Sequence, residues 1–452
     1  MRIYRSSHFS HKYLLVSILK TIDRRNLFFL TFKMGICGLP LLYAFINLLG
    51  SFAFGFFMTY PAPALPEMTK EMDISLFEST LFNSITSICA MVGAFLATFM
   101  IRFMGHKMST FMASLFGAAI SIALPFLTLY DIWFGISARG FAGIVVGAIS
   151  AIIPQNIKII APQEYMSIYG PMSQFGITFG STCCFFLSEG LNWKYLSFFC
   201  AGVCGLLCVL IWFVPLKAPT ESSNSHKESV FQKKYAKNLI IAVLIMFFQQ
   251  FSGINAIATN LNELFIAAGL PIPISIGSGI AASAQVIAVL IGGVMIYKFG
   301  RKFVWILSLF GSAALLILYA LTIKFPEWPK ILPIVIVFGY FLFFGIGLGP
   351  IPWFIIPEIF PASVASAAVS IGTMFNWICA FTVIMTFKYL VALCTSFGCM
   401  LIYTLICIAG GCFGIFFVTN GAEAEPEIVD ATADEYDVYK EPALLPDTPE
   451  EL

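Results

Sequence analysis

The chain has 452 residues, of which 59% are hydrophobic and only 11% are charged, and its formal net charge is +1. Soluble domains carry about 25% charged residues on average, so this composition excludes an ordinary water-soluble protein and predicts an outer surface that meets the lipid bilayer. Basic residues do not form a stripe interleaved with aromatic ones, which argues against a nucleic-acid partner.

Long apolar runs follow one another along the chain, each of roughly the length that crosses a bilayer as a helix. They predict an all-α membrane protein with twelve transmembrane helices. We expect the runs at 37–60, 80–101, 108–129, 133–157, 167–191, 195–216, 239–266, 273–297, 303–323, 331–357, 366–389 and 393–418.

The polar segments predict the domain organisation. Residues 217–237 are the only long polar interruption, and they divide the runs into two six-helix halves, 36–216 and 238–418. Residues 1–35 are basic and are expected to lie at the membrane surface. Residues 419–452 are acidic and are expected to form a disordered tail.

The distribution of Lys and Arg predicts the orientation, because cytoplasmic loops carry an excess of basic residues. Of the 25 basic residues, nineteen fall in the terminal segments and the loops on one face, five on the other face, and Arg139 inside a run. Both termini are therefore expected to be cytoplasmic. Each half also has a Gly-basic-Lys turn after its second run, at 105–107 and 300–302, which suggests two related halves around a midplane site.

The seventh run contains the amides Gln249, Gln250 and Asn255 around Gly253. Amides suit a neutral polyhydroxyl solute, because each offers both a donor and an acceptor. The glycine permits a local break that turns backbone groups toward a cavity. Hydrogen bonding between helices is the alternative explanation, and these residues alone do not decide between the two.

The tenth run ends in a segment rich in proline, with Pro350, Pro352, Pro357 and Pro361 around Trp353. So many prolines are incompatible with a regular helix. A broken helix here could act as a gate, with the indole of Trp353 stacking on a sugar ring. An irregular helix end is the alternative.

Other polar groups occur singly within the runs. The amides Gln174, Gln285 and Asn376 are each more often packing contacts than ligands. Arg139 is expected near the outer interface, where it could reach the headgroups. The first run contains no Asp or Glu, which favours downhill transport over proton coupling. No cluster predicts a metal, a cofactor or an enzymatic activity.

Three motifs carry a resemblance to a known family: QQFSGIN at 249–255, FGRK at 299–302 and GPIPWFIIPEIFP at 349–361. They resemble those of the sugar porters of the major facilitator superfamily, especially facilitative glucose and insect-type trehalose transporters. The resemblance implies that a sugar contacts Gln174, Gln249, Gln250, Asn255, Gln285, Trp353 and Asn376. It implies gating roles for Arg139, Gly300, Arg301, Lys302, Pro350, Pro352 and Glu358.

The chain departs from the family at its cytoplasmic charges. Arg102 and Tyr297 occupy the places of two acids, and Ile159, Met166 and Ala365 replace further charged residues. Glu358 with Arg301 or Lys302 is the one pair expected to remain. Loss of this network is expected to bias the carrier toward its inward-open state.

The sequence therefore predicts a facilitative transporter of a hexose- or trehalose-class sugar that works by alternating access. The alternatives are a sugar sensor or degenerate paralogue that does not transport, and a proton-coupled symporter. The family's usual location is the plasma membrane. The sequence does not indicate an oligomeric state.

Overall fold

The computed structural model describes residues 38–162, 165, 169–216 and 229–420. The basic segment 1–35, most of the linker 217–237 and nearly all of the tail 419–452 lie outside the described residues. The predicted domain boundaries therefore remain predictions.

The first half of the chain folds into helices that follow the predicted runs. They begin at polar caps where the sequence provides them: Ser75 and Glu78 form a reciprocal capping box, and Asp131 accepts from the backbone N–H of Trp133 at 2.8 Å. The helices are α3 (Leu39–Thr59), α4 (Pro61–Glu71), α5 (Leu76–Tyr130), α6 (Ile132–Ile160), α8 (Met172–Leu187) and α9 (Trp193–Leu210).

The second half contains more interruptions. Its helices are α10 (Ala236–Phe251), α11 (Ile254–Thr259), α12 (Leu261–Ala268), α13 (Ile274–Phe299), α14 (Arg301–Lys324), α15 (Leu332–Phe343), α16 (Ile351–Glu358) and α17 (Ala362–Phe417). A π-helical turn, η4 (Phe344–Leu348), lies between α15 and α16.

Nine helices in the described part of the chain are long and apolar enough to cross a membrane. Two of them, α5 and α17, each cover two predicted runs, which meet at residues of positive φ, Gly105 (74°) and Thr395 (65°). Helix α8 has 16 residues and corresponds to the fifth predicted run. The all-α membrane fold is confirmed, and the number of crossings remains a prediction.

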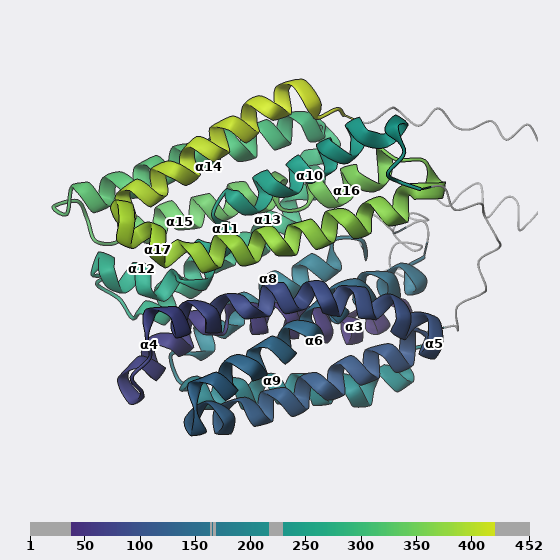
Figure 1. Ribbon diagram of the computed structural model, residues 1–452, viewed down its shortest axis with the longest axis horizontal. Helices are drawn as coiled ribbons and strands as arrows, with labels where there is room; N and C mark the ends of the chain where they lie inside the picture. Colours follow the sequence, from purple (N-terminus) through teal and green to yellow (C-terminus); the bar gives the residue numbers. More distant parts are fainter. Residues whose placement is uncertain (1–37, 163–164, 166–168, 217–228, 421–452) are drawn as a thin grey trace, which may run out of the picture.

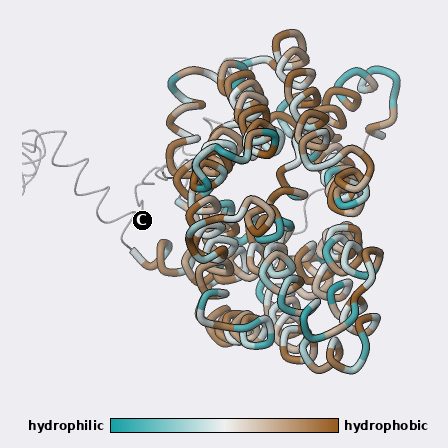
Figure 2. The backbone as a smooth tube through the Cα atoms, turned by 90° about the vertical axis from the view of Figure 1, so that its left-hand side faces the viewer, coloured by the Kyte–Doolittle hydropathy of each residue, from teal (hydrophilic) through white to brown (hydrophobic). Residues whose placement is uncertain are grey.

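The helices gather into two bundles (Figure 1), with α3 to α9 in the lower one and α10 to α17 in the upper one. Each bundle has its own apolar core, although a few residues cross over: Trp377 and Ala380 join the first core, and Ala62 and Phe185 join the second. Hydrophobic residues predominate along the helices seen end-on in Figure 2. Many large apolar side chains are exposed on the outside, as a bilayer requires.

Glycines allow the closest helix contacts in the first bundle. A methyl group added to Gly93 on α5 would collide with the carbonyl of Ile144 on α6. One added to Gly147 on α6 would collide with the carbonyl of Ala90 on α5. Small residues thus bring the two backbones into contact, which is how helices gain packing energy within a membrane.

The two ends of the molecule differ in charge. We call one the basic end, defined by the turns at Gly105 and Gly300 and their flanking Lys and Arg residues. These two glycines adopt similar positive-φ conformations, 74° and 77°, and each precedes a new helical segment. Helices α4 and α12 lie at the opposite end, on the left of Figure 1.

Candidate functional site

The seventh predicted run is broken at Gly253, as expected. Its φ of 93° ends α10 and starts α11. A Cβ atom here would lie 2.6 Å from the ring of Tyr403, so both the conformation and the available space require glycine. The break lies directly after the pair Gln249 and Gln250.

The tenth predicted run is also interrupted, but the position differs from the one expected. The irregular segment is the π-turn Phe344–Leu348, upstream of the prolines. Pro350 precedes α16 and Pro352 lies in its first turn, where a missing N–H costs no helical hydrogen bond. Pro350 and Pro352 therefore lie at the start of a new helix that follows the break, whereas Pro357 lies inside that helix.

Gln249 fills the gap in hydrogen bonding that this break creates. Pro352 has no N–H to donate to the carbonyl of Leu348, and the N–H of Trp353 bonds to Pro350 instead of Gly349. The amide nitrogen of Gln249 donates to both freed carbonyls, to Leu348 at 3.1 Å and to Gly349 at 2.7 Å. The side chain thus ties α10 to the broken helix.

Four of the predicted amides form one chain of hydrogen bonds, which we call the amide relay: Asn255, Gln250, Asn376 and Gln249. Asn255 donates to the Oε1 of Gln250 at 2.6 Å, and Gln250 donates to the Oδ1 of Asn376 at 3.1 Å. Asn376 donates to the Oε1 of Gln249 at 2.6 Å. The relay joins α10, α11 and α17 and ends on the carbonyls of Leu348 and Gly349, which precede α16.

Burial determines what the relay can do. Gln249, Gln250 and Asn376 are buried, and Asn255 at the donor end is half-buried. No relay member ionises, so the group offers only neutral donors and acceptors. Such groups can exchange hydrogen bonds with a neutral hydroxyl-rich solute, and Asn255 is the least buried member of the relay.

The other predicted contacts lie outside the relay. Within the described residues, no side-chain hydrogen bond connects Gln174, Gln285 or Trp353 to it. Gln174 on α8 and Gln285 on α13 are half-buried, whereas Trp353 on α16 is 40% exposed. Their roles in sugar contact remain predictions.

The side chain of Arg139 is fully buried, so the expectation that it reaches the headgroups is wrong. Its Nη1 donates to the carbonyl of Phe57 at 2.7 Å, and its Nε donates to that of Phe82 at 3.4 Å. Pro61 has no N–H for the Phe57 carbonyl, so Arg139 supplies the donor that proline removes from the α3–α4 junction.

The expected charged pair at the basic end is present. Arg301 pairs with Glu358, linking α14 to α16. Gly300 has positive φ, and the backbone N–H of Lys302 donates to the side chain of Asn420 at 3.0 Å. The roles of these residues in gating remain predictions.

The fold assembles one charged cluster that the sequence analysis did not predict. Lys388 pairs with Glu263, 125 positions away in the chain. Lys388 lies one residue before the end of the predicted run 366–389 and is counted among the five basic residues on the face opposite the basic end. The identity of its partner depends on the fold.

The family model described as sugar (and other) transporter matches residues 41–217 and 216–430. The chain belongs to this family. The sugar transporter ERD6-like 6 of Arabidopsis thaliana is 27% identical over 420 residues, which cover 82% of this chain and 85% of the relative. The facilitated trehalose transporter Tret1 of Bombyx mori is 27% identical over 442 residues, 85% of each chain.

Solved structures share the fold. The inward open conformation of the xylose transporter XylE from E. coli superposes with a TM-score of 0.73 at 19% sequence identity. The match covers 85% of this chain and 98% of the other. At this identity the likeness shows the major facilitator fold, and the predicted family resemblance is confirmed.

Proposed function

We propose that this chain is a facilitative carrier of a hexose- or trehalose-class sugar that works by alternating access. The amide relay carries the proposal, because it gathers neutral donors and acceptors from α10, α11 and α17 beside two broken helices. The curated relatives named as sugar and trehalose transporters support the substrate class.

Because the relay amides already bond to one another, a bound sugar would replace existing hydrogen bonds. Asn255 and Gln250 lie at the donor end of the relay, and the hydrogen bond between them would be replaced by bonds to sugar hydroxyls. Gln249 remains bound to the carbonyls of Leu348 and Gly349 and supports the shape of the site. Gln174, Gln285 and Trp353 would complete the contacts from α8, α13 and α16.

The absence of ionisable groups from the relay supports downhill movement. A proton symporter needs a titratable group coupled to the solute, and the relay consists of amides alone. The positive-inside rule places the basic end in the cytoplasm, and the family's usual location is the plasma membrane.

Uptake of labelled glucose and trehalose in a transporter-deficient cell tests the proposal. We expect saturable uptake that a proton ionophore leaves unchanged. Loss of uptake with the ionophore would indicate symport. Sugar binding to the purified chain without any uptake would indicate a sensor.

A further inference from the structure

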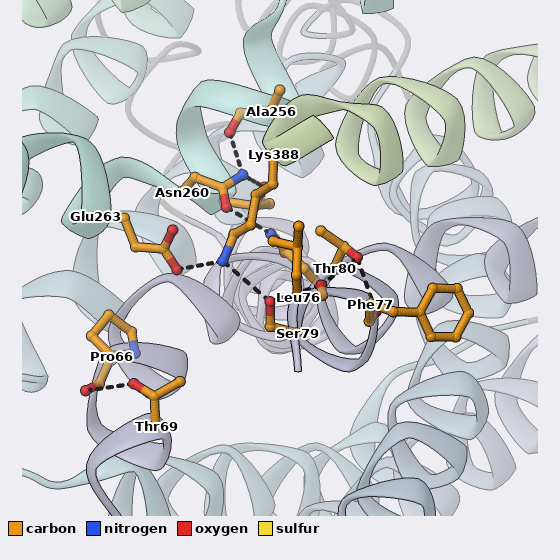
Figure 3. A network of polar contacts seen from close by, with 12 residues as sticks. Pro66, Thr69, Leu76, Phe77, Ser79, Thr80, Ala256, Asn260, Glu263 and Lys388 are labelled. Carbon is orange, nitrogen blue, oxygen red and sulfur yellow. Dashed lines mark hydrogen bonds and ion pairs between the residues drawn. The ribbon is translucent and has the colours of Figure 1, made fainter. Parts of the chain in front are cut away.

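Polar side chains connect the two bundles at the end opposite the basic turns (Figure 3). We call this cluster the outer latch and define it as Ser79, Asn83, Asn260, Glu263 and Lys388. Ser79 and Asn83 lie on α5, in the first bundle. Asn260 and Glu263 lie at and within α12, and Lys388 lies on α17.

Lys388 connects three helices. Its Nζ pairs with the Oε1 of Glu263 at 2.7 Å, which ties α17 to α12 within one bundle. The same nitrogen donates to the Oγ of Ser79 at 3.4 Å, which reaches the other bundle. Beside it, the Nδ2 of Asn83 donates to the Oδ1 of Asn260 at 3.3 Å.

The latch is largely withdrawn from solvent. The side chain of Lys388 is 15% exposed and that of Glu263 is 38% exposed. Asn83 and Asn260 are buried. An ion pair that is partly desolvated is stronger than one on the surface, and removing one member leaves the other charge unpaired.

Helix α11 connects the latch to the amide relay. It runs from Ile254 to Thr259, so Asn255 of the relay lies near its start and Asn260 of the latch follows its end. Thr259 bonds back to the carbonyl of Asn255 at 2.7 Å. The break at Gly253 separates this segment from α10, and the bond from Asn255 to Gln250 crosses that break.

We infer that the outer latch closes the route between the amide relay and the solution at this end, with Lys388 as its gating residue. Loading from this side requires Lys388 and Asn260 to release Ser79 and Asn83. The inference rests on the proposed carrier function and adds the element that controls access from the end opposite the basic turns.

Cysteine accessibility tests the latch. Thr259→Cys places a thiol at a buried position between relay and latch. Its reaction with a membrane-impermeant maleimide is measured in intact cells, and labelling of the same chain without Thr259→Cys is subtracted. We expect Lys388→Met to speed labelling about fivefold or more. The charge swap Lys388→Glu with Glu263→Lys should return the rate toward that of the unaltered latch.

Lys194→Met is the matched control. Lys194 pairs with Glu71 at 3.1 Å, and both residues belong to the first bundle. Breaking this pair should leave labelling unchanged, because it does not join the bundles. Equal acceleration by Lys194→Met, or no acceleration by Lys388→Met, would overturn the latch.

The labelling assay needs no sugar movement, so it separates the latch from the carrier proposal. A chain that fails to transport but shows faster labelling with Lys388→Met contradicts the proposed function alone. A chain that transports but shows no change contradicts the latch alone. If Lys388→Met does not reach the cell surface, the milder Ser79→Ala should speed labelling, and an unchanged rate there overturns the latch.

Discussion

At the residue scale, two buried side chains replace backbone donors that proline lacks. Gln249 serves the carbonyl of Leu348, whose helical partner would be Pro352. Arg139 serves the carbonyl of Phe57, whose helical partner would be Pro61. Unpaired carbonyls are costly in a membrane interior, so each proline depends on a polar side chain from another helix. These contacts lie at the junction of α3 and α4 and at the break between α15 and α16.

Arg139→Met should therefore lower the free energy of unfolding by about 1–3 kcal/mol, because it leaves the Phe57 carbonyl without a donor. The midpoint of thermal unfolding in detergent, followed by tryptophan fluorescence, measures this loss. The loss should shrink in a Pro61→Ala background, where the substituted alanine supplies its own N–H. Arg102→Met is the control, because Arg102 is exposed at the basic end.

Equal losses from Arg139→Met with and without Pro61 would show that the arginine does not act through the carbonyl of Phe57. A loss from Arg102→Met as large as that from Arg139→Met would point to a general effect of removing positive charge.

At the element scale, the break between α10 and α11 depends on one glycine. Gly253 and Gly269 both have positive φ, but only Gly253 has a neighbour within 4 Å of an added Cβ. Gly269→Ala should cost about 1 kcal/mol from backbone strain alone. Gly253→Ala adds a collision with Tyr403 and should cost at least twice as much while abolishing transport. Equal unfolding midpoints for the two variants would contradict this account.

The turn within α5 contains a buried histidine. His106, between two predicted runs, is buried, and its Nδ1 lies 3.0 Å from the Oδ1 of Asn156. The nitrogen of Asn156 donates to Asn47 and Thr110, so its oxygen accepts from the imidazole. Burial lowers the pKa of His106, although the Asn156 bond partly opposes this effect.

Because the folded protein favours neutral His106, stability is highest above the ordinary histidine pKa and falls as the pH drops below it. The unfolding midpoint should decrease between about pH 7.5 and pH 5.5. His106→Gln should flatten that dependence, since an amide can donate to Asn156 without titrating. An unchanged slope in His106→Gln would assign the pH dependence to other groups.

Sequence patterns could predict most of the elements. Apolar runs locate the helices, and Gly253 signals the break after α10. The π-turn before Pro350 was not predicted. Prolines mark where a helix can begin, whereas the irregular turn lies before them in the chain. The partners Gln249 and Asn376 lie 127 positions apart, and only the packing of α10 against α17 reveals them. The burial of Arg139 was not predicted, because its partners are the backbone carbonyls of Phe57 and Phe82, and no sequence pattern marks such partners.

At the scale of the whole molecule, two bundles meet through contacts that a transport cycle must break and remake. Side-chain contacts between the bundles occur toward the end opposite the basic turns, where Lys388 meets Ser79, Asn83 meets Asn260 and Ser84 meets Met385. At the basic end, Arg301 and Glu358 pair within one bundle. A carrier that rests open toward the basic end requires such contacts at its other end. The inward-open bias remains a prediction.

The most direct test of the account is counterflow of labelled sugar into liposomes that contain the purified chain. Sugar-loaded liposomes with the unaltered chain should accumulate labelled glucose or trehalose transiently and saturably. Gln250→Ala should reduce the initial rate by about tenfold or more, because it removes both a donor and an acceptor from the relay. Gln155→Ala, which removes an exposed amide bonded only to its own helix, should not. Counterflow no greater than in empty liposomes, or equal rates for Gln250→Ala and the unaltered chain, would contradict the account.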